Sequence, residues 1–345
     1  MSATAGPSIS ITSELGARLA PHLRERLGAD ALLAALERLP GGASRESWLL
    51  RVRRGDAREE ALVLRRDPPG HVIESSREGE AALLEAAARA GVPVPRVRWV
   101  ERDPAVLGAP FFVMDFVDGE TIGKKVLRDP GFAAGRAVLP EQLARALARI
   151  HAIDASPPAL AFLARPGAGR PPAQIELDRY RDVLRGIAPE PHPALELAIR
   201  WLGRRIPRPE AVTVVHGDFR IGNVIVGHDG LRAVLDWELA HTGDPLEDLG
   251  WFCVRSWRFG NDDRPAGGLC DRERLVAAYE QARGARVDRA AVRWWEIFGN
   301  LKWGVICIMQ AQTFLRGVPN VELASLGRRT AEMEWELLEL MEESR

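Results

Sequence analysis

The chain has 345 residues, of which 46% are hydrophobic and 28% charged, and its formal net charge is −1. These values are typical of a globular protein, and the balanced charge predicts no nucleic-acid partner. No apolar run reaches the ~20 residues that span a bilayer, so no membrane partner is expected either.

Three further features indicate the compartment and the number of lobes. The N-terminus lacks a basic region followed by an apolar one, and the three cysteines form no CxxC pair. We therefore expect a cytoplasmic protein without a disulfide framework. The length exceeds what one core usually organises, which favours two lobes.

The N-terminal region predicts helices at residues 13–27, where leucines recur every four positions, and at 31–36. A glycine-rich turn then enters a strand at 48–53. Gly41 and Gly42 would let the backbone approach phosphate oxygens, and the Ser44 hydroxyl could donate to them. An ordinary β-turn explains the same residues.

A second strand is expected at residues 60–66. Side chains alternate along a strand, so Val63 and Arg65 share one face while Leu64 and Arg66 share the other. This strand is either a plain surface strand that ends in two solvated arginines, or a strand from which one arginine points inward to bind phosphate.

A long helix at 73–90 follows, ended by the GVPVP turn at Gly91. Strands at 96–101 and 110–116 bring the first lobe to about five strands. The second of them, PFFVMDFVDG, ends in a polar and small stretch.

After Gly119 the composition becomes helical, with a Pro/Gly/Ala-rich segment at 156–172 that predicts a mobile surface loop. His151 is expected to pack or cap at a helix end. The tryptophans of the last third are expected in a core, or alternatively around an acceptor pocket. The helices are expected at 140–151, 174–185, 193–204, 272–283, 289–314 and 320–343.

The most informative stretch runs from residue 212 to 251. His216 and Asp218 follow a β-rich run, Asn223 comes five residues after Asp218, and Asp236 closes the second apolar run of a predicted hairpin. Two carboxylates and an amide at the ends of short strands offer the hard oxygen ligands of a magnesium–phosphate site. Asp218 would remain available to orient or deprotonate an attacking hydroxyl.

The HGDxxxxN motif followed by DWE resembles the aminoglycoside-phosphotransferase (APH) family of small-molecule kinases, which are relatives of the protein kinases. The resemblance implies an α+β, protein-kinase-like fold of two lobes. Residues 1–116 would form an N-lobe with a five-stranded antiparallel sheet plus helices. Residues 117–345 would form a mainly helical C-lobe.

The same resemblance implies roles for the motif residues. Asp218 would be the catalytic base, His216 would support the catalytic loop, and Asn223 and Asp236 would bind Mg²⁺. The GDPLEDLG segment matches the family's GDPxxDL, in which we expect Asp248 to bind the catalytic-loop backbone or Arg220.

Further roles concern the nucleotide. Arg65 would take the place of the kinase strand lysine, and Glu80 would pair with it, with Glu78 as the alternative. The family carries a GG-x-S segment at the position of Gly41, Gly42 and Ser44.

The strand ending at 116 resembles the kinase hinge. Met114 would be the gatekeeper, and the Asp115 carbonyl and the Val117 N–H would bind the adenine edge.

The implied function is Mg²⁺- and ATP-dependent transfer of a phosphoryl group to a hydroxyl of a small molecule. Three segments, LVLRR, DWELAHTGDPLEDLGW and WGVICIMQAQTFLRG, resemble the kinase-like domain fused to acyl-CoA dehydrogenases, which suggests a hydroxyacyl-CoA-type acceptor. An aminoglycoside or a choline- or homoserine-type acceptor is the alternative. A catalytically silent nucleotide-binding module and a metal-dependent hydrolase are the rivals from other classes.

Overall fold

The structure is a computed structural model of the chain, and it describes residues 8–9, 14–39, 46–55, 58–67, 77–167, 169–188 and 190–344. The predicted phosphate-contacting residues Gly41, Gly42 and Ser44 lie outside these ranges. The chain divides into two compact units, and the first comprises Met1–Glu120, Ser156–Phe162 and Arg232–Glu238. The second unit comprises the remaining residues.

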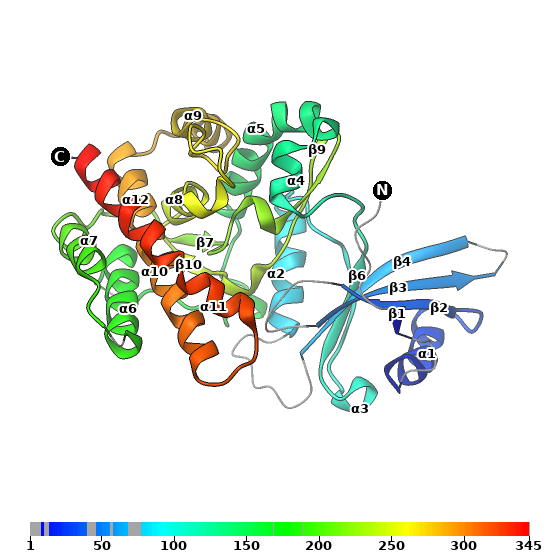
Figure 1. Cartoon of the computed structure of the whole chain (residues 1–345). Helices are drawn as coiled ribbons and strands as arrows, with labels where there is room; N and C mark the ends of the chain where they lie inside the picture. The colour runs from blue at the N-terminus through cyan, green and yellow to red at the C-terminus, as the bar shows by residue number, and fades with distance from the viewer. Residues whose placement is uncertain are drawn as a thin grey trace. The chain divides into compact units, whose positions relative to one another are not determined.

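The first unit contains an antiparallel sheet of five longer strands with a two-residue strand at one edge, in the order β1-β2-β3-β4-β6-β5 (Figure 1). The expected five-stranded antiparallel sheet is therefore present. Its strands are β1 (Ser8–Ile9), β2 (Leu32–Arg38), β3 (Glu46–Arg54), β4 (Arg58–Arg66), β5 (Val97–Glu101) and β6 (Phe111–Asp115).

The two faces of this sheet have different partners. Leu62 and Leu64 of β4 join a buried cluster with Leu19 and Leu23 of α1 (Glu14–Leu27). The opposite face carries Arg65, which pairs with a glutamate of α2 (Arg77–Arg89). A short helix, α3 (Pro104–Leu107), precedes β6. The strand alternation thus places Leu62 and Leu64 on one face of the sheet and Arg65 on the other.

The helix expected at 31–36 is wrong, because residues 32–36 belong to strand β2. β2 pairs with β3, placing Leu36 opposite Leu50. A short apolar run has no periodicity that distinguishes a strand from a helix, and its hydrogen bonds here come from a strand further along the chain.

The second unit is mainly helical. Its long central helix α10 packs against α8, α11 and α12 (Figure 1). Its helices are α4 (Gly123–Arg128), α5 (Ala133–Ile150), α6 (Pro172–Ile187), α7 (Pro193–Gly203), α8 (Leu246–Phe252), α9 (Arg272–Arg283), α10 (Arg289–Leu315), α11 (Val321–Gly327) and α12 (Thr330–Glu343).

The continuous helix expected at 320–343 is also wrong, since it is broken between α11 and α12. Gly327 ends α11 where an added Cβ would lie 2.7 Å from the Cβ of Ala311 on α10. This close approach favours glycine, and the chain resumes its helix only at Thr330.

Short strands lie between α7 and α8 in the chain, and residues 232–234 among them belong to the first unit. β7 (Thr213–Val215) pairs with β10 (His241–Gly243), and β8 (Val224–Gly227) forms the expected hairpin with β9 (Gly230–Val234). The three cysteines are free and buried. Within the described ranges, no helix has the length and apolar character needed to cross a membrane.

Candidate active site

The loop after β7 carries His216, Gly217 and Asp218 in a strained path. Gly217 adopts φ +79°, and an added Cβ would lie 2.4 Å from the carbonyl oxygen of Leu239. Only glycine fits this left-handed position next to another backbone segment. The side chain of Asp218 follows immediately, so its position depends on this turn.

Asp248 of α8 binds the backbone of this loop. Its two carboxylate oxygens accept hydrogen bonds from the backbone N–H groups of His216, at 2.8 Å, and Gly217, at 2.9 Å. The expectation that Asp248 binds the loop backbone is confirmed. Asp244 accepts from the Leu246 N–H at the start of the same helix, as a capping aspartate does.

His151 completes this anchor. Its Nε2 lies 3.0 Å from Asp248, and its Nδ1 lies 2.7 Å from the Tyr279 hydroxyl. Burial alone would raise the pKa of Asp248, but the hydrogen bond from His151 and the backbone donors lower it. The carboxylate therefore stays charged beneath the loop. His151 packs as expected, but its contact with Asp248 spans 97 residues and has no local sequence signal.

The carboxylate of Asp218 is held by three side chains. Asn223 Nδ2 donates to Oδ2 at 2.6 Å, Trp251 Nε1 donates to Oδ1 at 2.7 Å, and Arg220 Nε lies 3.2 Å from Oδ1. His216 contributes through Nδ1, which accepts from the Asp218 N–H at 3.3 Å. The structure thus brings His216, Asp218 and Asn223 together. Trp251 was expected in a core or around an acceptor pocket, and its contact with Asp218 was not predicted.

The first unit contains the arginine–glutamate pair that the family resemblance implies. Arg65 Nη1 lies 3.1 Å from Glu80 Oε1, so the predicted pair is present. The alternative, Glu78, is half-exposed and pairs with Arg102 instead. Arg66 points to the other face, where it binds Glu46 at 2.7 Å.

Asp236 belongs to this first unit as well. Its Oδ1 lies 3.6 Å from Arg65 Nη2, and its backbone adopts φ +64°. Burial alone would lower the pKa of Arg65, but Glu80 and Asp236 raise it. The guanidinium therefore remains a fixed positive charge.

The predicted hinge residues end strand β6. Met114 is buried and pairs with Val63 of β4 and Val97 of β5, while Asp115 binds Arg98. Val117 follows the strand within the first unit. The backbone roles predicted for Asp115 and Val117 stay predictions.

The candidate metal ligands fit Mg²⁺ by their chemistry. Asn223 uses its amide nitrogen on Asp218, which leaves its carbonyl oxygen as a hard ligand, and Asp236 offers a carboxylate. No group of three or more His, Cys, Asp or Glu side chains suited to a metal occurs among the described residues. Mg²⁺ commonly takes one or two protein ligands and completes its shell with phosphates and water.

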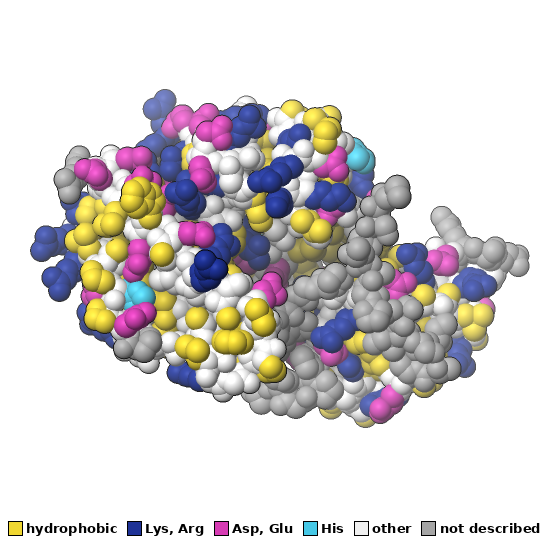
Figure 2. Space-filling model, in the orientation of Figure 1, with side chains coloured by type: hydrophobic (Ala, Val, Ile, Leu, Met, Phe, Trp, Pro, Cys, Tyr) yellow, Lys and Arg dark blue, Asp and Glu magenta, His cyan; other side chains and the backbone are white. Residues whose placement is uncertain are grey.

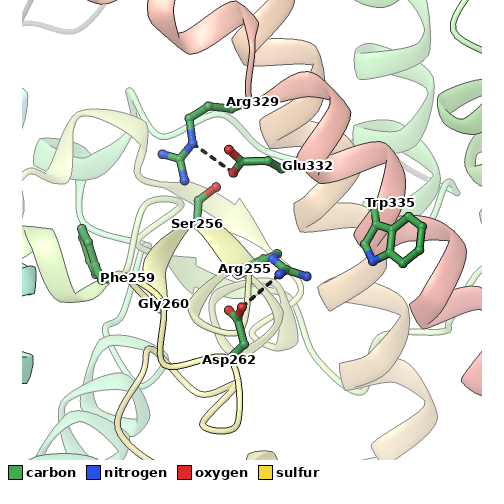
Figure 3. Close-up of a pocket in the computed structure, with 8 residues that line it drawn as sticks. All are labelled: Arg255, Ser256, Phe259, Gly260, Asp262, Arg329, Glu332 and Trp335. Atoms are coloured by element: carbon green, nitrogen blue, oxygen red, sulfur yellow. Dashed lines mark hydrogen bonds and ion pairs between the residues drawn. The ribbon is translucent and has the colours of Figure 1, made fainter.

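A pocket of about 520 Å³ opens in the second unit. Figure 3 shows Arg255 directed toward Asp262 and Arg329 toward Glu332, with Trp335 at one side. Its lining residues are Arg255, Ser256, Phe259, Gly260, Asp262, Arg329, Glu332 and Trp335. The pocket therefore combines aromatic surface with equal numbers of positive and negative groups.

One chain of contacts links this pocket to Asp218. Trp257 follows the lining residue Ser256, and its ring packs 5.3 Å from that of Trp251, whose indole N–H reaches Asp218. Arg220, which also contacts Asp218, lies over the Trp257 ring at 4.8 Å from its centroid. Several tryptophans are thus core residues, as expected, while the exposed Trp335 lines the pocket.

The sheet, the loop that carries Asp218 and the Arg65–Glu80 pair agree with the class that the motifs imply, a small-molecule phosphotransferase. The chain belongs to the phosphotransferase enzyme family, APH, whose sequence profile matches residues 35–295.

Curated relatives share part of this chain. It is 33% identical over 201 residues to mouse acyl-CoA dehydrogenase family member 10, covering 56% of this chain and 18% of the relative. It is 30% identical over 233 residues to the probable acyl-CoA dehydrogenase IBR3 of Arabidopsis thaliana, covering 62% and 27%. The chain thus spans less than a third of the length of these relatives.

Solved structures share the fold. A Ralstonia eutropha protein, provisionally named an aminoglycoside phosphotransferase, superposes with TM-score 0.73 at 24% identity, covering 93% of this chain and 97% of that one. Macrolide 2'-phosphotransferase MphH from Brachybacterium faecium gives 0.61 at 21% identity, covering 89% and 97%. APH(4)-Ia, solved with AMP-PNP and hygromycin B, gives 0.59 at 16%, covering 92% and 97%. The expected α+β, kinase-like fold is confirmed.

Proposed function

We propose that this protein transfers the γ-phosphoryl group of ATP to a hydroxyl group of a small molecule. The observation that carries the proposal is the Asp218 carboxylate, which is fixed by Asn223 and Trp251 on a loop anchored by Asp248. A carboxylate fixed in this way can accept the proton of the attacking hydroxyl. The intact set of Asp218, Asn223 and Asp236 favours an enzyme over a silent nucleotide-binding module.

The other residues supply positioning and charge. Arg65, held by Glu80, would bind a phosphate group of the nucleotide through its guanidinium fork. Asn223 and Asp236 would hold Mg²⁺, which neutralises the charge that develops on the phosphates. Such positioning and electrostatic stabilisation provide most of the catalysis in phosphoryl transfer.

For the acceptor, we propose a hydroxylated anionic metabolite of the hydroxyacyl-CoA type. The similarity to acyl-CoA dehydrogenase family members supports this class. The pocket with Arg255 and Arg329 argues against a strongly cationic acceptor, because its arginines offset its carboxylates. On the face shown in Figure 2, basic and acidic side chains lie interspersed over the second unit. An aminoglycoside, a polycation, would need a stronger acidic surface.

The nucleotide half of the proposal is tested by thermal shift with ATP, with and without Mg²⁺. A ligand that binds only the folded state at a hundredfold excess over Kd stabilises it by about 2.7 kcal/mol. We expect a Mg²⁺-dependent rise in Tm that is reduced in Asp236→Asn. No shift with ATP or GTP would contradict an active kinase.

The acceptor half is tested by ADP release with a panel of acceptors: 3- and 4-hydroxyacyl-CoAs, kanamycin, choline and homoserine. We expect turnover with a hydroxyacyl-CoA that is about 10²–10⁴-fold slower in Asp218→Asn. Turnover with kanamycin alone would replace the proposed acceptor by an aminoglycoside. ATP hydrolysis at the same rate without any acceptor would indicate a hydrolase.

A further inference from the structure

Trp251 makes an unusual contact for a buried core residue. It is 3% exposed, and its indole N–H donates to Oδ1 of Asp218 from a position 33 residues later in the chain. A buried indole N–H needs an acceptor, and here the acceptor is a side-chain carboxylate in the candidate active site. Asn223 donates to Oδ2, and Arg220 Nε contacts both oxygens at 3.2 and 3.3 Å, so each oxygen has one neutral donor of its own. Rotation of the carboxylate would break both bonds.

Lys302 of α10 lies behind this tryptophan. Its ammonium group is 4.6 Å from the centroid of the Trp251 ring, a cation–π distance. The same group donates to the carbonyl oxygen of Gly217 at 3.3 Å and lies 3.3 Å from Glu247 Oε1. Lys302 therefore contacts both the residue that precedes Asp218 and the ring that donates to it.

The surroundings keep Lys302 charged although it is only 4% exposed. Burial alone would lower the pKa of its ammonium group, but Tyr180, Glu247, Glu176 and Asp218 raise it. A cation on the indole face draws electron density from the ring and strengthens the N–H as a donor. A neutral side chain of the same size would neither draw electron density from the ring nor strengthen its N–H as a donor.

We propose that Trp251 and Lys302 are positioning residues for phosphoryl transfer, in which Lys302 holds the Gly217 carbonyl and the Trp251 ring, and Trp251 fixes the Asp218 carboxylate. The proposal rests on the function proposed above, in which Asp218 is the base. Fixing the carboxylate matters because a misplacement of about 1 Å at a reacting group costs on the order of 100-fold in rate.

Kinetics test this role with a matched control. Trp251→Phe keeps an aromatic ring but removes the N–H, and we expect kcat to fall about 10- to 100-fold with both KM values nearly unchanged. The control is Trp303→Phe. Trp303 packs in the same cluster, 6.4 Å from Trp251, and its indole N–H has no hydrogen-bond partner among the described residues. Its kcat should change less than about twofold.

The Asp218→Asn background separates positioning from structure. If Trp251 acts through Asp218, adding Trp251→Phe to Asp218→Asn should cost less than about twofold, since coupled residues are not additive. An equal loss in both backgrounds would show a merely structural tryptophan. Lys302→Met should lower kcat about tenfold, and Lys302→Arg should recover part of it by restoring the cation.

Indole NMR tests the contact without any acceptor. The chain has 10 tryptophans, and the Trp251 N–H signal is assigned by its loss in Trp251→Phe. We expect this proton to move upfield in Asp218→Asn, because an amide accepts more weakly than a carboxylate, and to move in Lys302→Met. An unmoved signal in Asp218→Asn overturns the inference. A moved signal in a protein that phosphorylates no acceptor supports the contact and contradicts only the proposed function.

Discussion

The two candidate groups for catalysis are stabilised in different ways. In the first unit, Arg65 is buried between the carboxylates of Glu80 and Asp236, so charge compensates charge. In the second unit, Asp218 is held by donors of which two, Asn223 and Trp251, are neutral. A buried pair becomes costly when one partner is removed, whereas a hydrogen-bonded carboxylate can exchange a donor for a substrate hydroxyl. The comparison contrasts a cation fixed by opposite charges in one unit with a carboxylate held largely by neutral donors in the other.

The largest effect is expected from Asp218→Asn, which keeps the shape of the side chain but removes its basicity. General-base catalysis contributes about 10²–10⁴ in rate, so kcat in the ADP-release assay should fall by that factor. Tm should change little. Asp263→Asn, at an exposed aspartate, is the matched control and should retain full activity. A loss below about fivefold in Asp218→Asn would remove Asp218 from the role of base.

Removing the hydrogen bonds that Asp248 accepts from the loop should mainly lower the stability of the fold. Asp248→Asn replaces an acceptor by an NH₂ group facing the N–H of His216 or Gly217. An unsatisfied buried N–H, together with a weaker hydrogen bond to His151, should lower the free energy of unfolding by about 2–4 kcal/mol. Urea denaturation measures this change. A loss under about 0.5 kcal/mol would mean that the loop is held by other contacts.

Breaking the ion pair of Arg65 and Glu80 should mainly weaken nucleotide binding. Glu80→Gln leaves Arg65 without its closest carboxylate, so we expect ATP to bind about tenfold more weakly, or about 1.4 kcal/mol. Glu78→Gln, on the same helix but half-exposed, serves as the control. Calorimetric titration with ATP measures both. Equal effects of the two variants would contradict the assignment of Glu80.

The smallest expected effect concerns pH. Burial alone would lower the pKa of His241, but Glu247, 3.2 Å away, raises it to about 9. A raised pKa stabilises the fold fully below the unfolded value of about 6.5, and this contribution is lost as pH rises through 9. Tm should therefore fall by a few degrees between pH 6.5 and 9.5.

The matched variant for this pH effect is His241→Gln, which should show a shallower fall in Tm over the same range. Parallel curves for the two proteins would assign the pH dependence to other groups.

The sequence alone was enough for local features. Alternation along β4 predicted that Arg65 and Arg66 lie on opposite faces of the sheet. The structure agrees, because Arg65 pairs with Glu80 and Arg66 pairs with Glu46. The motif spacing identified Asp218 and Asn223, which do meet. These features depend on strand geometry and on residues close in the chain, so the local pattern contains the necessary information.

Tertiary structure decided what depends on distant segments. Residues 32–36 form a strand because β3 supplies their hydrogen bonds. Asp236 joins the first unit although it follows Asp218 by 18 residues. Trp251 and Lys302 reach the catalytic loop from 33 and 85 residues away. The sequence around a helical tryptophan or lysine does not identify the residue it will contact, because side-chain contacts across such separations form only when the helices pack.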